Sequence, residues 1–159
     1  MEQQEKRAKR YRLRVNEKEI KLISKMIDEM SIGLEVIYYL LDHKALDSFV
    51  IVLMSAENID IHNLIRENKR ETDLAYCLDE ASGLHAVLCQ ETRIDGGYMF
   101  GERITEMAAE EDGRSIYCAE LEVRTSRYDI KDLIFKIYEL YRQSQEEQRE
   151  KEVVFRTIN

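Results

Sequence analysis

The order of strand-like and helix-like segments constrains the fold more than any single motif. Residues 48–55, SFVIVLMS, are continuously apolar and β-rich, which is typical of a buried central strand. A short amphipathic helix is expected at 61–70, and a hairpin at 73–91 with Gly83 in its turn. The remaining expected elements are a helix at 95–111 capped by Asp95 or Thr92, a strand at 115–123, a long helix from Asp129 and a strand at 152–158.

The first six of these elements run strand, helix, strand, strand, helix, strand. That succession is the pattern of a ferredoxin-like fold. We therefore expect an α+β domain with a mostly antiparallel sheet and with its helices on one face of that sheet.

A long helix is expected before the sheet. Asn16 and Glu19 form a capping-box pattern, and the apolar residues that follow alternate at intervals of three and four, as in coiled coils. We expect the C-terminal half of this helix to pack on its own domain, its N-terminal half to pair with another chain, and Gly33 to mark a kink between them. The predicted units are a basic segment with this helix at 1–45 and the sheet domain at 46–159. The apolar seam is Ile20, Ile23, Ile27, Met30, Leu34, Ile37 and Leu41, with a second row of Leu22, Met26, Ile32, Val36 and Leu40.

Charge limits the classes of partner. The formal net charge is −8, and an acidic chain is a poor match for nucleic acid, because neutralising phosphates needs a surplus of Lys and Arg. Residues 6–14 form a basic block, which is either a solvated helix start or a contact for anionic lipid or an acidic partner. The sequence has neither an 18-residue apolar run nor a secretory signal, so we expect a cytoplasmic protein, with peripheral membrane contact through residues 6–14 as the alternative.

Cysteine and histidine usage gives no metal pattern. Cys77, Cys89 and Cys118 are odd in number and lack metal-binding spacing, so they are interpreted as reduced, buried strand residues. The three histidines are scattered, and His85 is interpreted as a packing or hairpin residue. No metal and no resident cofactor are therefore expected.

Three local strings carry a family resemblance. The motif Arg70-Glu71-Thr72-Asp73 stands five residues before the turn Asp79-Glu80-Ala81-Ser82-Gly83, and the string Gly101-Glu102-Arg103-Ile104 follows on a helix. In order and spacing these strings resemble the GGDEF family of diguanylate cyclase domains. That family has an RxxD motif, five residues, a GGDEF signature at a hairpin tip, a strand, and a helix containing "AER". The resemblance implies a palm-type, GGDEF-like sheet.

The departures from the family pattern concern catalysis. Catalysis in the family resembles that of other palm-type enzymes, in which carboxylates of the first strand and the hairpin hold metal ions that activate a 3′-hydroxyl. Here Ser55 stands near the expected first-strand carboxylate, and Asp79 and Glu80 replace the two glycines of the signature. The segment between Asn58 and Arg70 is short and lacks the family's Phe-Lys-Asn and Gly-His strings. The chain is therefore interpreted as a degenerate domain without cyclase activity.

The ligand-binding residues of the family are present. In active members RxxD is an inhibitory site for the product, cyclic di-GMP, and an arginine of the "AER" helix joins it. The resemblance thus implies ligand-binding roles for Arg70, Asp73 and Arg103. An arginine fork can contact a phosphate or the guanine O6 and N7 atoms, and an aspartate can accept from guanine N1 and N2. The alternative is that Arg70 and Asp73 simply pair with each other at the surface and that Arg103 is a solvated charge.

Together these features predict an inactive GGDEF-like signalling domain that binds cyclic di-GMP and passes the signal to a protein partner or a second copy through its N-terminal helix. This design is similar in logic to the cyclic di-GMP receptor of the Pel exopolysaccharide system. The alternative is an interaction or scaffold protein that binds no nucleotide and oligomerises through the same helix. An active cyclase is the third possibility.

Overall fold

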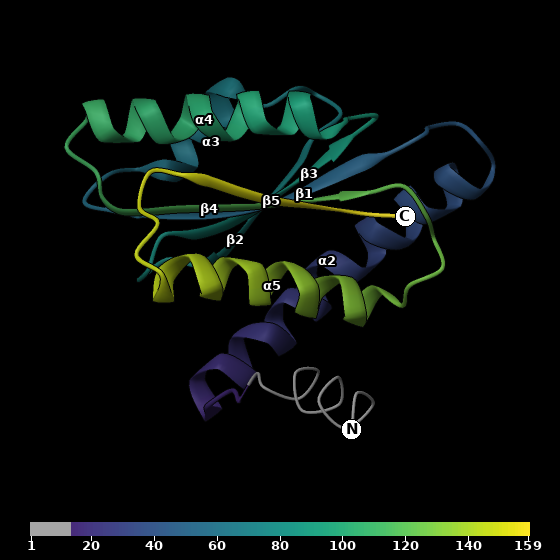
Figure 1. Cartoon of the computed structure of the whole chain (residues 1–159), viewed down its shortest axis with the longest axis horizontal. Coiled ribbons are helices and arrows are strands. Elements are labelled where there is room, and N and C mark those ends of the chain that lie inside the picture. Colours follow the sequence, from purple (N-terminus) through teal and green to yellow (C-terminus); the bar gives the residue numbers. More distant parts are fainter. Residues whose placement is uncertain (1–13) are drawn as a thin grey trace, which may run out of the picture.

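A five-stranded sheet forms the centre of the protein, and the computed structural model describes residues 14–159 (Figure 1). The strands follow one another across the sheet in the order β2-β3-β1-β4-β5. The strands are β1 (Phe49–Glu57), β2 (Leu74–Asp79), β3 (Leu84–Gln90), β4 (Arg114–Val123) and β5 (Val153–Ile158). The helices are α2 (Glu17–Asp42), α3 (Ile61–Asn68), α4 (Ile94–Glu110) and α5 (Ile130–Glu146).

The topology confirms the predicted α+β class. Strand β1 pairs antiparallel with both β3 and β4, and β2 pairs antiparallel with β3, which is the ferredoxin-like arrangement. Strand β5 then adds to the far side of β4 in parallel, after the crossover through α5. The predicted hairpin at 73–91 is the β2–β3 pair.

The helices cover both faces of the sheet, so the expectation of helices on one face was wrong. Helices α3 and α4 lie on one side and α2 and α5 on the other (Figure 1). The physical reason lies in β1, where Val50 and Val52 face the α3–α4 side while Ile51 and Leu53 face the α2–α5 side. Because both faces are buried, β1 is a continuous apolar run, whereas a strand covered on one face alternates.

Helix α2 begins with the predicted capping box. The Glu19 N–H donates to Asn16 Oδ1 at 2.9 Å, and Glu19 Oε1 accepts from the Asn16 N–H at 3.3 Å. The helix continues through Gly33, where a Cβ would lie 2.5 Å from the Tyr76 hydroxyl of β2. Gly33 therefore allows a close approach between helix and sheet.

Buried apolar residues in both halves of α2 pack on this domain. Ile23 and Met26 in the N-terminal half are buried in the same core as Leu34 and Ile37 in the C-terminal half. Burial of Ile23 takes one seam residue out of the expected pairing of the N-terminal half with another chain, but Ile20 is 52% exposed, so that pairing stays a prediction. Ile32 and Val36 of the second row are also exposed.

Helix α4 begins at Ile94, and the predicted caps Asp95 and Thr92 were wrong. The N-cap residue, Arg93, makes no side-chain capping hydrogen bond. The Ile94 N–H donates instead to the carboxylate of Glu122, a buried residue of β4. A carboxylate at this position compensates the partial positive charge of the helix N-terminus.

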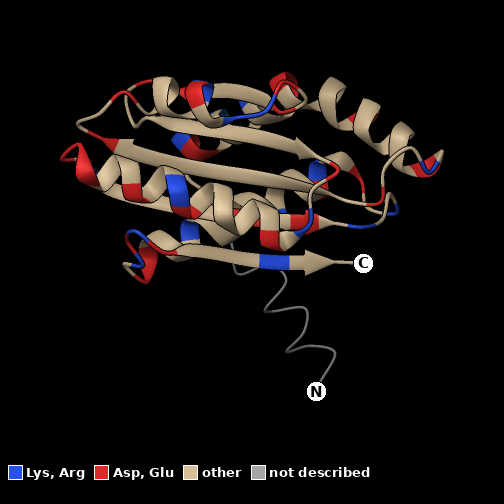
Figure 2. Cartoon of the chain, turned by 90° about the horizontal axis from the view of Figure 1, so that it is seen from above, with Lys and Arg blue, Asp and Glu red and all other residues tan. Residues whose placement is uncertain are grey.

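Charged residues lie on the helices and connecting turns, and the strands carry few of them (Figure 2). None of the helices within residues 14–159 combines the length and apolar character needed to cross a membrane. The expectation of lipid or partner contact through residues 6–14 concerns residues outside the described part of the chain, except for Arg14.

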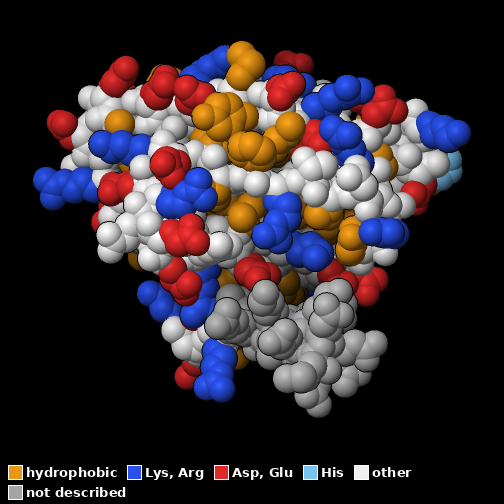
Figure 3. Space-filling view, viewed as in Figure 1, with side chains coloured by type: hydrophobic (Ala, Val, Ile, Leu, Met, Phe, Trp, Pro, Cys, Tyr) orange, Lys and Arg blue, Asp and Glu red, His pale blue; other side chains and the backbone are white. Residues whose placement is uncertain are grey.

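Apolar side chains gather on one face over α4 and β5, where Tyr98, Met99 and Phe155 are exposed (Figure 3).

Candidate functional site

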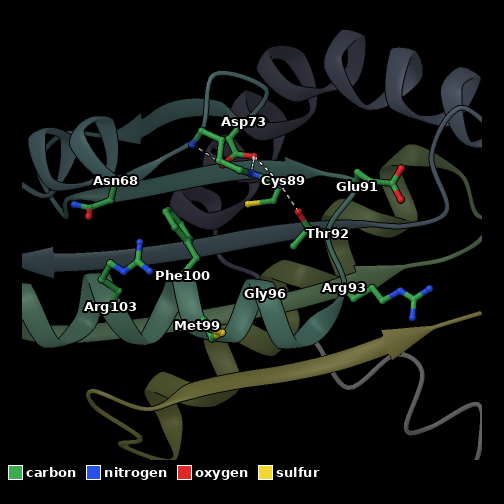
Figure 4. Close-up of a pocket in the computed structure, with 11 residues that line it drawn as sticks. Asn68, Asp73, Cys89, Glu91, Thr92, Arg93, Gly96, Met99, Phe100 and Arg103 are labelled. Carbon is green, nitrogen blue, oxygen red and sulfur yellow. Dashed lines mark hydrogen bonds and ion pairs between the residues drawn. The ribbon is translucent and has the colours of Figure 1, made fainter.

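The three residues predicted to bind ligand line one cavity. Arg70, Asp73 and Arg103 border a hollow of about 330 Å³ between the start of β2, the end of β3 and helix α4 (Figure 4). That volume is at the lower end of the range of about 300–1,000 Å³ found for small-molecule sites. Asp73 and Arg103 are 30 positions apart in the sequence, and the fold places both at the border of the same cavity.

Arg70 is held from several directions. Its Nη2 donates to Asp73 Oδ1 at 2.9 Å, to the Gln90 carbonyl at 2.6 Å and to Thr92 Oγ1 at 2.6 Å. Its Nε donates to Asp73 Oδ1 at 3.2 Å. Within residues 14–159 these hydrogen bonds involve Nε and Nη2 only, so the Nη1 group is left to face a ligand or solvent. The hydrogen bond to Asp73 raises the pKa of Arg70, which keeps the guanidinium charged.

Asp73 is buried, with 4% of its surface exposed, although it is a charged residue. Its Oδ2 accepts the Arg70 backbone N–H at 2.8 Å, and the Asp73 N–H donates to the Arg70 carbonyl at 3.0 Å. These bonds close residues 70–73 into a tight turn and compensate the loss of water around the carboxylate. A guanine could reach the Asp73 oxygens only by replacing some of the contacts made by Arg70.

Arg103 contributes the opposite side of the cavity. It extends from α4 on the same side as Asn68, whereas Arg93 points away from the cluster (Figure 4). Arg103 is exposed, and the ion pairs within residues 14–159 do not include it. The structure brings Arg103 to the same cavity as Arg70 and Asp73, and its role in binding stays a prediction.

Most of the other lining residues were missed. Gly96, Phe100 and Arg103 follow one another at intervals of four and three along α4, so they share one helix face. That periodicity was a usable signal, because Arg103 alone had been singled out on the face. The ring of Phe100 supplies an apolar wall next to the cationic groups, a combination that suits a planar anionic ligand.

Cys89 also lines the cavity from β3. Burial raises the pKa of its thiol, so the thiolate is disfavoured and the side chain acts as a small apolar surface. Cys77, Cys89 and Cys118 all lie on strands and are free, and the two last are buried. The prediction of unbridged strand cysteines is confirmed, but Cys77 is only half-buried.

Residues 79–83, which stand where the resemblance places the family signature, form the turn between β2 and β3. Asp79 ends β2, Gly83 precedes β3 with φ of +68°, and a Cβ on Gly83 would lie 2.3 Å from the Ala56 carbonyl. Ser82 donates to Asp79 Oδ2 at 2.7 Å, while Glu80 and Ala81 are exposed at the tip. The turn thus packs closely on the end of β1 and holds the Asp79 carboxylate in a local hydrogen bond.

Ser55 occupies the position near which the family pattern has a carboxylate. It is buried, and its Oγ lies 2.6 Å from the Tyr141 hydroxyl of α5. Burial raises the pKa of Tyr141 to about 12, so the phenol is neutral and can share its proton with Ser55. Among residues 14–159 no three His, Cys, Asp or Glu side chains are grouped as a metal site.

The fold is that of GGDEF-type diguanylate cyclase domains. The active GGEEF domain of a diguanylate cyclase from Vibrio cholerae superimposes with a TM-score of 0.60 over 76% of this chain and 89% of that one, at 10% identity. Diguanylate cyclase SiaD from Pseudomonas aeruginosa, solved in complex with its activator SiaC, gives a TM-score of 0.61 at 12% identity. That alignment covers 79% of this chain but 57% of SiaD. No protein-family model and no curated protein sequence matches the chain.

Proposed function

We propose that this protein is a catalytically inactive GGDEF-like signalling domain that binds cyclic di-GMP at Arg70, Asp73 and Arg103 and passes the signal to a partner protein. The observation that carries the proposal is that these three residues line one cavity. The cyclase fold of the structural neighbours supports the choice of a guanine dinucleotide as ligand. Because the cavity is small, part of the ligand is expected to lie outside it, where a second copy could share it.

Charge and shape support an anionic, planar ligand. Nη1 of Arg70 and the guanidinium of Arg103 can donate to phosphate oxygens or to guanine O6 and N7. Phe100 offers a face on which a base can stack. In this proposal Asp73 accepts from guanine N1 and N2 after Arg70 turns toward the ligand.

The hairpin end of the sheet supports the absence of cyclase activity. Ser55 is engaged by Tyr141, and Asp79 by Ser82, so neither side chain is arranged with a second carboxylate to hold a pair of metal ions. The glycines that would let a guanine nucleotide approach the turn are Asp79 and Glu80 here.

A direct packing route connects the cavity with α2. Leu74 follows Asp73 in the chain, and its Cδ1 lies 3.2 Å from the position of a Cβ on Gly33 of α2. A ligand that moves Asp73 therefore acts on Leu74 and on the helix next to it. The outer face of α2 exposes Ile32, Val36 and Tyr39, which we propose as the surface that meets the partner.

Calorimetry with cyclic di-GMP tests the binding step. We expect saturable binding to the wild type, strongly weakened binding in Arg70→Ala and Arg103→Ala, and unchanged binding in Arg114→Ala, an exposed arginine at the far end of β1 and β4. No heat at about 100 µM ligand, equivalent to about 5.5 kcal/mol of affinity, would overturn the receptor proposal.

The same titration separates the alternatives. The hydrogen bonds between Arg70 and Asp73 favour the alternative hypothesis of a scaffold protein that binds no nucleotide, in which these residues only close a turn. A protein that binds no cyclic di-GMP but self-associates through α2 would fit that reading. Incubation with GTP and Mg²⁺ tests the third possibility, an active cyclase, because such an enzyme would form cyclic di-GMP.

A further inference from the structure

His85 has a buried ring nitrogen that the fold leaves without a partner. The residue lies on β3, opposite Met54 of β1 and Cys77 of β2, and 4% of its surface is exposed. Its Nε2 atom has no hydrogen-bond partner within residues 14–159. Buried polar atoms in native proteins are nearly always paired, so an unpaired one calls for a physical explanation.

The other ring nitrogen fixes the chemistry of Nε2. Nδ1 of His85 lies 2.9 Å from the Gly83 carbonyl oxygen, and a carbonyl only accepts, so Nδ1 carries the hydrogen. Burial lowers the pKa of His85, which keeps the ring neutral. Nε2 is therefore an unprotonated nitrogen with a free lone pair. An Nδ1–H bond to a backbone carbonyl is also the usual way in which a protein orients a histidine that ligates a metal through Nε2.

A second imidazole stands next to it. His62 is exposed on the first turn of α3, and its ring centroid is 5.5 Å from that of His85, with the two planes inclined by 38°. Two imidazoles that share one tetrahedral ion at metal–nitrogen distances of about 2.1 Å have centroids about 5 to 6 Å apart. The separation of the two rings therefore matches the one that a common ion requires.

We propose that His62 and His85 bind a divalent transition-metal ion, with Zn²⁺ as the leading candidate. Neutral imidazole is a good ligand for Zn²⁺, Cu²⁺ and Ni²⁺ and a poor one for Mg²⁺. Since no group of three His, Cys, Asp or Glu side chains is present among residues 14–159, water completes the coordination sphere. Asp60, whose Oδ1 caps α3 by accepting the Asn63 N–H, is the carboxylate available to hold such a water.

The ion would join two elements that otherwise meet only by packing. His62 belongs to the start of α3, and His85 follows the hairpin turn by two residues. Binding would fix the start of α3 to β3 and raise the thermal stability of the folded chain, because the unfolded chain does not hold the two rings together. This inference is independent of cyclic di-GMP binding, since the cavity of Arg70 lies at the opposite end of β3.

Titration of the untagged full-length chain with Zn²⁺ at neutral pH tests the site. We expect one ion per chain by calorimetry, binding weakened by about tenfold or more in His62→Ala, and unchanged binding in His43→Ala. His43 is a matched control, because it is an exposed histidine at the other end of the fold. His62 is exposed, so its removal leaves the core intact, whereas His85→Gln serves as a second variant only if its circular dichroism is native.

Co²⁺ identifies the ligands directly. Visible bands of nitrogen- and oxygen-ligated Co²⁺ that disappear in His62→Ala support the site. A thiolate charge-transfer band that disappears in Cys77→Ser would assign the ion to a cysteine and overturn the proposal. Equal Zn²⁺ affinity of the wild type and His62→Ala, or loss of binding in His43→Ala, would overturn it as well.

Discussion

The guanidinium of Arg70 and the carboxylate of Asp73 bind each other around a turn of four residues, with Nη2 2.9 Å from Oδ1. The two side chains differ in exposure, because Asp73 is buried while 52% of the Arg70 side chain is exposed. An ion pair between exposed residues is worth about 0–1 kcal/mol, but a carboxylate that is buried beneath its partner depends on that partner much more. The pair is therefore a structural element and a candidate ligand site at once.

Replacing Asp73 with alanine is expected to destabilise the protein by about 1–3 kcal/mol. The substitution leaves the Arg70 backbone N–H and part of its guanidinium without their acceptors in a partly buried turn. Urea denaturation followed by circular dichroism measures the loss. Glu71→Ala, at an exposed neighbouring position of the same turn, is the control and should change the free energy of unfolding by less than about 0.5 kcal/mol. Equal stabilities of the two variants would show that the pair is merely a surface contact.

Glu120 predicts an unusual pH dependence of stability. It is fully buried on β4 beneath α4, its Oε1 has no hydrogen-bond partner in the described part of the chain, and burial raises its pKa from 4.5 to about 8. Between pH 4.5 and about pH 8, the Glu120 carboxyl group is protonated in the folded protein but ionised in the unfolded chain. The contribution of Glu120 to stability is therefore fully present below pH 4.5, falls as the pH rises, and is lost above about pH 8.

The isosteric change Glu120→Gln removes this titration. We expect the variant to gain more than about 1 kcal/mol of unfolding free energy relative to the wild type between acidic and mildly alkaline pH. Urea titrations of both proteins across that window measure the difference, and other titrating groups cancel in the comparison. Glu122→Gln is the contrasting variant, because Glu122 is paired with Arg124 at 2.8 Å and caps α4. A wild type and a Glu120→Gln variant with parallel pH profiles would contradict the assignment.

Gly101 makes room for the same carboxyl group. A Cβ at Gly101 would lie 2.4 Å from Glu120 Oε2, and one at Gly97 would lie 2.7 Å from Oε1. Gly101→Ala is expected to lower the melting temperature by several degrees, because a well-packed interior tolerates little extra volume. Gly96→Ala, whose Cβ would only touch Thr92 at 3.4 Å, should be neutral or stabilising by helix propensity. A reversed order of the two variants would show that α4 is not packed on Glu120 as described.

This contact also explains one departure from the family pattern. Glycine stands where the "AER" string has alanine, and the sequence offered no reason for the change. The reason is a residue 19 positions later, on a strand that crosses beneath the helix. Local periodicity predicted the helix around Gly101, but the glycine itself depends on a tertiary contact that no sequence window contains.

The strands and helices were predictable because their signals are local. The continuous apolar run of β1, the alternation of β4 and the capping box of α2 each follow from neighbouring residues. The cap of α4 was not predictable, because its acceptor, Glu122, comes from another strand. The continuous apolar run of β1 already implied that both faces of the sheet are covered. Helices were nevertheless expected on one face only, because that is the usual arrangement of the ferredoxin-like pattern.

The candidate site was predictable in part for the same reason. Arg70 and Asp73 are close in sequence, and the family spacing added Arg103. Thr92 and the Gln90 carbonyl, which hold Arg70 in place, come from the end of β3 and have no motif of their own. The unpaired Nε2 of His85 was likewise not predictable from the sequence, since it depends on which face of the hairpin meets α3.

The variant Ser55→Asp tests whether β1 can accept a carboxylate near the position where the family pattern has one. Ser55→Asp places an ionisable group at a buried position where the neighbouring group is the neutral Tyr141 hydroxyl, so we expect destabilisation by several kcal/mol at neutral pH. The loss should shrink as the pH falls and the new carboxyl group is protonated. Ser55→Ala, which removes the contact of Tyr141 with Ser55 but leaves the hydrogen bond that the Tyr141 hydroxyl accepts from Gln145 Nε2, should cost about 1–2 kcal/mol independently of pH. Urea titrations at acidic and neutral pH separate the two variants. A stable Ser55→Asp protein that forms cyclic di-GMP from GTP and Mg²⁺ would show that the catalytic site is one substitution from activity, contrary to the tight packing of Ser55 against α5.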